Sequence, residues 1–214
     1  MTFERTDPFY ALDLSDPMNP VILGELEIPG FSQFMHPIKE DNSMLLTVGK
    51  DADENGFVTG FQVSIFDSSD PSDPKLVDRL VLGHGGGTSS ESSWDERAFR
   101  YIQVGDVGRL IIPLYSSTWD RLGGAAKIMD GFTVFGIDLN KTEKMITREI
   151  DIDHWSDPYD SRGCYCSQVW LPSRSMVFDG NLMTMKNSKV INTNLDSAET
   201  QWKLTFQETE CCRP

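Results

Sequence analysis

The sequence has no long hydrophobic run and is short of basic residues. No segment approaches the ~18 consecutive apolar residues that a transmembrane helix needs, so we expect no transmembrane segment. Lysine and arginine number 19 against 33 aspartates and glutamates, and the formal net charge is −14. Because such a chain repels phosphate groups, nucleic-acid binding is excluded as its main role, and docking on anionic membranes is disfavoured. Met1 is followed by Thr-Phe-Glu-Arg, without a basic and then apolar segment, so we expect no signal peptide in these residues.

Helical periodicity is missing as well. Apolar residues come in short runs that alternate with polar ones, the period-2 pattern of half-buried strands. Turn residues separate the runs at 53–56, 179–181 and 186–188. The sequence therefore predicts an all-β fold, with strands that include residues 21–23, 44–48, 61–66, 109–112, 132–135 and 189–191.

An internal repeat organises these strands. Residues 10–20 read Tyr-Ala-Leu-Asp-Leu-Ser-Asp-Pro-Met-Asn-Pro, and residues 64–74 read Ser-Ile-Phe-Asp-Ser-Ser-Asp-Pro-Ser-Asp-Pro. Weaker copies occur at 136–140 and 190–196, and another strand is expected after each copy. Four units of this length fit a β-propeller or partial propeller with about four four-stranded antiparallel blades. The alternative is a β-sandwich with two similar turns.

The aspartates that end the repeated strands, Asp13, Asp67 and Asp138, have two interpretations. They could form a ring of carboxylates around a propeller axis. We favour the other interpretation, in which each carboxylate accepts backbone hydrogen bonds inside its own turn.

Several segments carry a resemblance to a known family: Thr6 to Ser32, His36-Pro37, and residues 48–56, 60–67 and 174–178. With these segments the chain resembles the secreted β-propeller domain family of bacteria and archaea, which has relatives in unicellular eukaryotes. The resemblance implies a propeller at the cell surface or outside the cell, and it implies no activity, because the family is mostly uncharacterised. We expect a propeller domain over residues 1–206, incomplete without further blades of the same full-length protein, and a cysteine-containing tail over 207–214.

The sharpest chemical motif is Asp51-Ala-Asp53-Glu-Asn55-Gly56, which matches the start of a calcium loop. Oxygen atoms at positions 1, 3 and 5 of a tight turn can converge on one hard cation. The carbonyl of Phe57 and, through water, Thr59 would complete the site. We expect a weak calcium site of ~10⁻⁴–10⁻³ M. The alternative is an ordinary hairpin turn without metal.

Cysteine is scarce and confined to Cys164, Cys166, Cys211 and Cys212. Four cysteines allow three disulfide connectivities, which the sequence does not separate. We favour disulfides over unpaired thiols and over a four-thiolate zinc site, since the spacing does not suit a tetrahedral ion.

Aromatic residues in expected loops are candidates for contacts with a protein or carbohydrate ligand: Trp94, Trp119, Trp155 and Tyr159. They fall in or near the loops 83–97, 116–127 and 153–166. The alternative is that these rings pack against their own blades. His36 precedes a proline, which predicts a place in a turn.

The favoured function is non-catalytic binding by an extracellular or cell-surface propeller scaffold, stabilised by calcium. Two alternatives remain: a calcium-assisted hydrolase built on a propeller, and a surface adhesion or assembly module. Because propellers host both enzymes and binding proteins, the fold alone does not choose between these functions.

Overall fold

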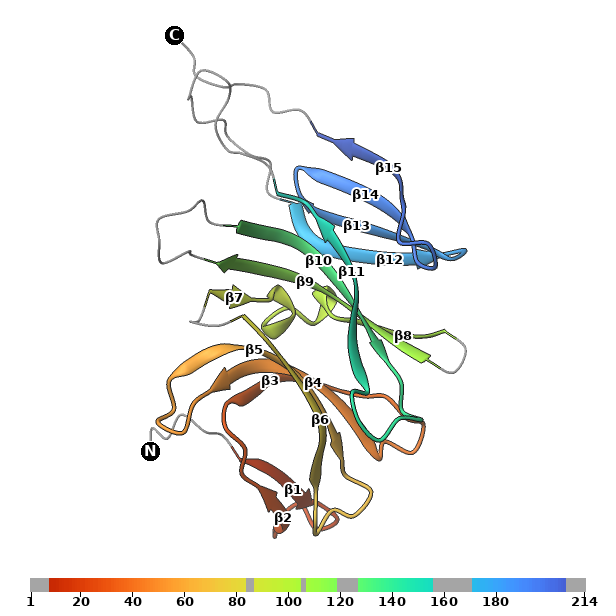
Figure 1. Ribbon diagram of the computed structural model, residues 1–214. Coiled ribbons are helices and arrows are strands. Elements are labelled where there is room, and N and C mark those ends of the chain that lie inside the picture. The colour runs from red at the N-terminus through yellow and green to blue at the C-terminus, as the bar shows by residue number, and fades with distance from the viewer. Residues whose placement is uncertain (1–7, 84–86, 105–106, 119–126, 156–170, 207–214) are drawn as a thin grey trace.

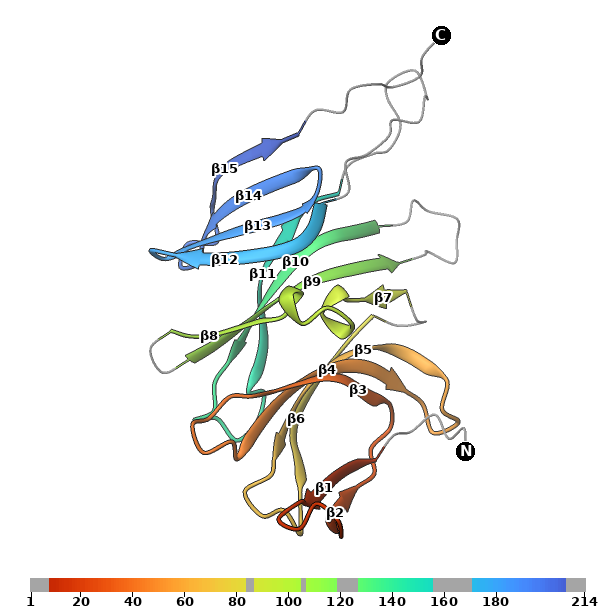
Figure 2. The same cartoon turned by 180° about the vertical axis from the view of Figure 1, so that it is seen from behind.

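The chain folds almost entirely into antiparallel β-sheet (Figure 1). The computed structural model describes residues 8–83, 87–104, 107–118, 127–155 and 171–206. A two-stranded sheet is followed by three sheets of four or five strands. Figures 1 and 2 show these sheets as successive layers that do not close into a ring. The predicted class, all-β with a propeller or partial propeller, is therefore confirmed.

Each sheet is formed by consecutive strands. The half-blade has two strands, β1 (Phe9–Asp13) and β2 (Val21–Leu26). Blade 1 has four, β3 (Phe31–Pro37), β4 (Met44–Ala52), β5 (Val58–Asp67) and β6 (Lys75–Leu82). Blade 2 contains β7 (Thr88–Ser89), the 3₁₀ turns η1 (Glu91–Ser93) and η2 (Glu96–Ala98), β8 (Arg100–Val104), β9 (Val107–Thr118), β10 (Lys127–Ile137) and β11 (Ile146–Asp153). Blade 3 has β12 (Leu171–Phe178), β13 (Asn181–Asn187), β14 (Lys189–Asn194) and β15 (Thr200–Thr205).

The sequence repeat marks the last hairpin of every sheet. Its four copies join β1 to β2, β5 to β6, β10 to β11 and β14 to β15. In three copies the strand register shifts at the same place, two residues before the Asp or Asn of the turn, at 11/12, 65/66 and 192/193. In the copy around Asp138 the shift lies at 134/135. The half-blade thus corresponds to the third and fourth strands of a full blade.

The repeated Asp or Asn holds its own turn. Its side-chain oxygen accepts a hydrogen bond from the backbone N–H two residues later: Asp13 from Ser15 (2.8 Å), Asp67 from Ser69 (2.9 Å), Asp138 from Asn140 (3.1 Å) and Asn194 from Asp196 (3.0 Å). The hydrogen bonds from Ser69 lower the pKa of the Asp67 carboxyl. This geometry supports the structural interpretation of these residues over a ring of carboxylates.

The hydrophobic core lies between blades. Alternate residues of β9 point to opposite faces of blade 2: Leu110 and Ile112 pack against blade 1, and Ile111 packs against blade 3. One cluster includes Phe61 and Ile65 of blade 1, both fully buried. The other joins blade 2 to Leu182, Ile191 and Leu195 of blade 3 and its last turn. Blade 2 is therefore apolar on both faces.

Blade 2 differs from its neighbours at its first strand. Two short strands, β7 and β8, pair with the same partner β9, and η1 and η2 lie between them in the chain. Pro113, which has no N–H to donate, lies in β9 between the residues paired with β8 and those paired with β7. The two 3₁₀ turns bring residues 90–99 against β3 and β12, the first strands of blades 1 and 3.

A buried histidine joins blades 2 and 3. His154 follows β11, and its side chain has no exposed surface. Its Nε2 lies 2.9 Å from Oγ1 of Thr184, and its Nδ1 lies 3.3 Å from the carbonyl oxygen of Lys186. Beside it, the Lys186 ammonium lies 2.8 Å from Asp130 of blade 2. Burial lowers the pKa of His154 to about 4, so the imidazole is neutral at pH 7.

Both ends of the sheet array expose apolar side chains. On the half-blade, Leu12 and Ile22 are 52% and 61% exposed. On blade 3, Trp202 and Leu204 lie on the face of β15 opposite to Lys203, which is paired with the core residue Ile191. These two side chains are 45% and 51% exposed. The two end faces have the apolar character of the interfaces between blades, and no sheet formed by the described residues covers them.

The turn interpretation predicts a specific mutational pattern at Asp67. Asp67→Ala should lower the free energy of unfolding by about 1 kcal/mol, the usual value of such a side chain-to-backbone bond. Asp67→Asn should change it little, because the Asn194 amide already serves in the fourth copy. Urea denaturation of the three proteins at pH 7 measures both effects. An Asn variant as unstable as the Ala variant would contradict this interpretation.

His154 predicts a loss of stability in mild acid. The folded protein holds a neutral imidazole with a pKa of about 4, whereas the unfolded chain takes up a proton near pH 6.5. The stabilisation of the folded state that comes from this pKa difference is complete above pH 6.5 and is lost as the pH falls to about 4. Because one pKa unit corresponds to ~1.4 kcal/mol, the loss amounts to roughly 3 kcal/mol.

The matched variant is His154→Gln. It should be less stable at pH 7, but it should lose about 3 kcal/mol less than the wild type between pH 7 and pH 4. Carboxylates titrate equally in both proteins, so the difference between their pH profiles isolates the histidine. Parallel profiles would exclude this role.

Candidate functional site

The first strands of the three blades border one open groove of about 590 Å³. Strands β3, β8 and β12 contribute to it, together with η2. Its lining combines aromatic and charged side chains: Phe34, His36, Glu96, Arg97, Phe99, Arg100, Tyr101 and Arg174. Segments far apart in the sequence thus build a single concave surface.

One wall of the groove is aromatic. The rings of Phe34 and Phe99 lie 4.7 Å apart at an angle of 49°. His36 is next to them, with its ring 5.5 Å from that of Phe99 and 6.0 Å from that of Tyr101. Burial lowers the pKa of His36 and raises that of Tyr101, so both are neutral at pH 7. This wall offers flat, uncharged surfaces on which a ring can stack.

The other wall is built around Asp95. Its carboxylate accepts a hydrogen bond from the backbone N–H of Arg97 (3.0 Å) and caps η2. The same carboxylate bonds the Arg97 guanidinium at 3.0 Å and Nη2 of Arg174, from blade 3, at 2.8 Å. The Arg97 hydrogen bond is the main reason that the pKa of Asp95 falls to about 2. Asp95 is thus ionised and neutralises two arginines that line the groove.

Arg100 is held differently. Its Nε donates to the carbonyl oxygen of Ser175 at 3.0 Å and lies 3.1 Å from the Ser175 hydroxyl. These contacts connect blade 2 to blade 3. Within the described parts of the chain, Arg100 forms no ion pair with a carboxylate. Its terminal nitrogens are therefore available to an anionic group in the groove.

A second hollow of about 580 Å³ adjoins this groove and shares three of its lining residues with it. Trp94 and Ser93 are among the residues that line it. Trp94, a predicted binding residue, is 71% exposed. The Ser93 hydroxyl is buried without a hydrogen-bond partner. The predicted loop 83–97 thus contributes to a concave surface; its residues 84–86 lie outside the described chain.

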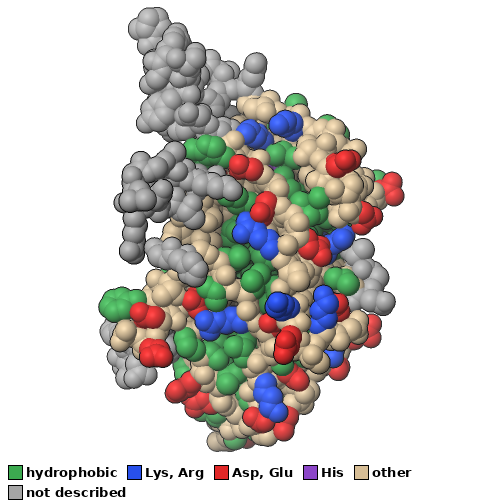
Figure 3. All heavy atoms as spheres, in the orientation of Figure 1, with side chains coloured by type: hydrophobic (Ala, Val, Ile, Leu, Met, Phe, Trp, Pro, Cys, Tyr) green, Lys and Arg blue, Asp and Glu red, His purple; other side chains and the backbone are tan. Residues whose placement is uncertain are grey.

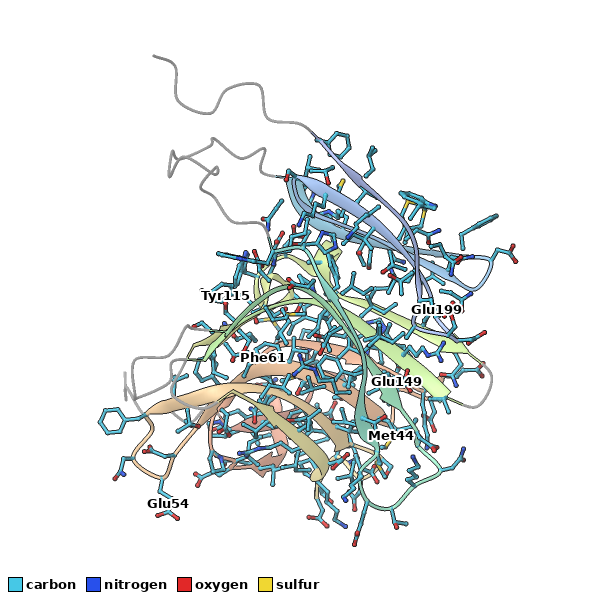
Figure 4. All side chains as sticks on the ribbon, turned by 45° about the horizontal axis from the view of Figure 1, so that its top comes forward. Met44, Glu54, Phe61, Tyr115, Glu149 and Glu199 are labelled. Atoms are coloured by element: carbon cyan, nitrogen blue, oxygen red, sulfur yellow. The ribbon has the colours of Figure 1, made fainter. Side chains whose placement is uncertain are left out.

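The calcium motif lies on the hairpin between β4 and β5. Asp53 Oδ1 accepts hydrogen bonds from the backbone N–H groups of Asn55 (2.9 Å) and Phe57 (2.8 Å), and the Phe57 carbonyl accepts one from Asp53 N (2.9 Å). Figure 4 shows Glu54 at the tip of this hairpin, pointing away from the sheet. The predicted turn is confirmed, and Asp53 is bonded within it.

Asp51, the first residue of the motif, is buried near the end of β4. One carboxylate oxygen pairs with the Arg79 guanidinium of β6, and the other accepts a hydrogen bond from the Thr59 hydroxyl. A calcium ion here would compete with Arg79 for the same carboxylate. The part of the chain that the structure describes holds no group of three or more Asp, Glu, His or Cys side chains suited to a metal ion. Calcium binding stays a prediction.

Other predicted site residues are placed elsewhere or lie outside the description. Trp155 follows β11 at the junction with blade 3, where its carbonyl oxygen accepts a hydrogen bond from Lys189 at 2.5 Å. It borders neither hollow. Outside the described residues lie Trp119, Tyr159, Cys164, Cys166, Cys211 and Cys212. Their predicted roles stay predictions, and so does that of the tail 207–214.

Sequence reasoning missed most of the groove. The placement of His36 in a turn is wrong: the residue belongs to β3, and its ring faces Phe99 and Tyr101. Arg174 is 79 residues from its partner Asp95, so no local pattern connects them. One signal was present in the run from Asp95 to Tyr101, where aromatic and arginine residues interleave.

Comparison with known proteins finds two archaeal relatives of this chain. It is 49% identical over 82 residues to an uncharacterized protein of Archaeoglobus fulgidus, and 42% identical over 82 residues to one of Methanocaldococcus jannaschii. Each match covers 38% of this chain and 12% of the relative. The chain therefore matches only a small part of these longer proteins.

Among solved structures, two of AztD from Citrobacter koseri are similar to this chain at 10% sequence identity and a TM-score of 0.28. The apo structure is matched over 94% of this chain and 92% of AztD, and the other over 96% and 80%.

A family model covers nearly the whole chain. The model describes a beta propeller domain and matches residues 1–198. The match includes all four copies of the repeat and the strands that border the groove. With its successive antiparallel blades and repeated turns, the chain belongs to the beta propeller domain family.

Proposed function

We propose that this propeller is a non-catalytic scaffold that binds a small ligand or a segment of a partner protein. The observation that carries the proposal is the groove along the first strands, built jointly by β3, β8 and β12. A concave site with aromatic walls and a few placed polar groups is typical of ligand recognition. Arg174 and Arg100, which line this groove, link blades 2 and 3, so the groove is held by contacts between blades.

The chemistry of the groove supports binding over turnover. Its histidine, His36, is neutral and surrounded by the rings of Phe99 and Tyr101. Among the described residues, no hydrogen bond orients the His36 ring, whereas catalytic nucleophile–base pairs are typically held by such a third group. The calcium motif lies on the β4–β5 hairpin and lines neither hollow, so an ion there would stabilise structure.

We further propose an extracytoplasmic location, which the resemblance to secreted propellers supports. Figure 3 shows acidic and basic side chains interspersed over one face, a surface suited to water. No helix among the described residues is long and apolar enough to span a membrane.

The two apolar end faces support a proposal about the whole protein. Apolar clusters fill the interface between blades 1 and 2 and the interface between blades 2 and 3, and the exposed side chains of Leu12 and Ile22 and of Trp202 and Leu204 share that character. We propose that further blades of the same full-length protein cover them. The relatives, of which the match spans 12%, are long enough to supply such blades.

The calcium proposal predicts a shift in thermal stability. Millimolar calcium should raise the unfolding temperature of the wild type, because an ion that binds only the folded state stabilises it. Asp53→Asn should reduce this rise, because it removes a negative charge from the site, while it keeps the turn, since an amide oxygen can still accept the bonds from Asn55 and Phe57. Calorimetry with calcium and with chelator measures the effect. A wild-type unfolding temperature that does not respond to calcium would reject the site.

The groove proposal predicts binding of a neutral aromatic probe. Benzyl alcohol should bind with millimolar affinity, and amide NMR shifts should cluster at Phe34, Phe99 and Tyr101. Phe99→Leu, which keeps an apolar side chain but removes the ring, should weaken binding severalfold. Phe178→Leu is the control, because Phe178 is 75% exposed on blade 3 and lines neither hollow. Absent or scattered shifts would count against the groove as a recognition site.

A further inference from the structure

We infer that the groove selects ligands that carry an aromatic ring and a single carboxylate, with Arg100 as the residue that binds the carboxylate. This inference rests on the proposed binding function and names its ligand class. It follows from three features of the groove: the distribution of charge among its arginines, the anchoring of Arg100, and the position of the aromatic wall.

The three arginines of the groove are not equivalent. Arg97 and Arg174 share Asp95, and Arg174 also lies 3.7 Å from Glu91. These two positive charges are thus neutralised inside the protein. Arg100 has no carboxylate within 4 Å among the residues that the structure describes. In a protein of net charge −14, a guanidinium in a concave site without an acidic partner is the feature that a ligand anion would satisfy.

Arg100 is also oriented before any ligand arrives. Its Nε is bonded to the carbonyl oxygen of Ser175, and the Ser175 hydroxyl is 3.1 Å away. These contacts fix one edge of the guanidinium against blade 3. The fork of terminal nitrogens remains for a second partner, and its geometry matches the two oxygens of a carboxylate. Little side-chain entropy then remains to be lost on binding.

The neighbouring residues define the rest of the ligand. Phe99 and Tyr101 flank Arg100 in the chain, and because side chains alternate along an extended strand, their rings pack toward blade 1 while Arg100 extends to Ser175 of blade 3. All three residues line the groove, so a ligand bound there contacts the aromatic wall and meets the guanidinium across the edge of β8. Glu96 also lines the groove, and it disfavours a second negative charge on the ligand. A monoanion should therefore bind better than a phosphate dianion.

The test compares three probes of similar size: benzoate, benzyl alcohol and phenyl phosphate. The wild type should bind benzoate at least tenfold more tightly than benzyl alcohol, the range expected of a charge-assisted hydrogen bond. Phenyl phosphate should bind more weakly than benzoate at pH 7.5. Dissociation constants come from NMR titration at low ionic strength, where surface charges are screened least.

Variants assign the preference to one residue. Arg100→Gln should reduce the benzoate preference to less than twofold and leave benzyl alcohol binding unchanged, which also shows that the groove is intact. Arg100→Lys should keep part of the preference, because it keeps the charge and loses the fork. The control is Arg148→Gln, which removes an arginine of β11 that pairs with Asp151 and lines neither hollow.

Each other outcome overturns the inference in a distinguishable way. If wild type binds both probes equally, the carboxylate preference is wrong while the binding function stands. If the preference survives Arg100→Gln, the assignment to Arg100 is wrong. If no probe binds the wild type, the inference and the proposed binding site both fail.

Discussion

The structure depends on burying both faces of blade 2. Leu110 and Ile112 face one neighbour and Ile111 faces the other, so alternate residues of a single strand serve two cores. Each large apolar side chain buried in this way contributes roughly 1.5–3 kcal/mol. Blade 2 cannot satisfy this requirement alone, because a sheet with two apolar faces needs a sheet on each side. The repeated hairpins matter mainly because they place these faces in register.

Polar residues at the junctions then restrict how the blades meet. Between blades 2 and 3, His154 and the Lys186–Asp130 pair bridge the two sheets where the apolar cluster ends. Such buried polar groups cost free energy unless each finds its partner, so they favour one relative placement of the sheets. The geometry of the groove depends on this relative placement, since Asp95 of blade 2 and Arg174 of blade 3 must meet to form it.

The fold was predictable because its signals are local and repeated. The Asp-x-x-Asp-Pro turns, the period-2 strands and the Asp-Gly turn at 179–180 all lie within a few residues of the bonds they make. The limit of this reasoning is visible in β11. Ile146 and Ile150 are four residues apart, which in a regular strand places both side chains on the same face of the sheet. The pairing of β11 with β10 skips Glu149, and this bulge turns the two isoleucines to opposite faces and into different cores. A bulge leaves no such mark in an alternating pattern.

The candidate site was harder to predict because it depends on few core residues. Its charged members stand on first strands and on the two 3₁₀ turns, where the sheets end and burial no longer dictates residue type. Asp95, Arg100 and Arg174 are explained by contacts across blades, with partners 75 to 79 residues away. Residues that determine the fold and residues that line the candidate site therefore occupy different positions in the blades. Local patterns encode the repeated hairpins that stack the sheets, and the edges of those sheets, where packing constrains residue type less, carry the residues of the proposed binding groove.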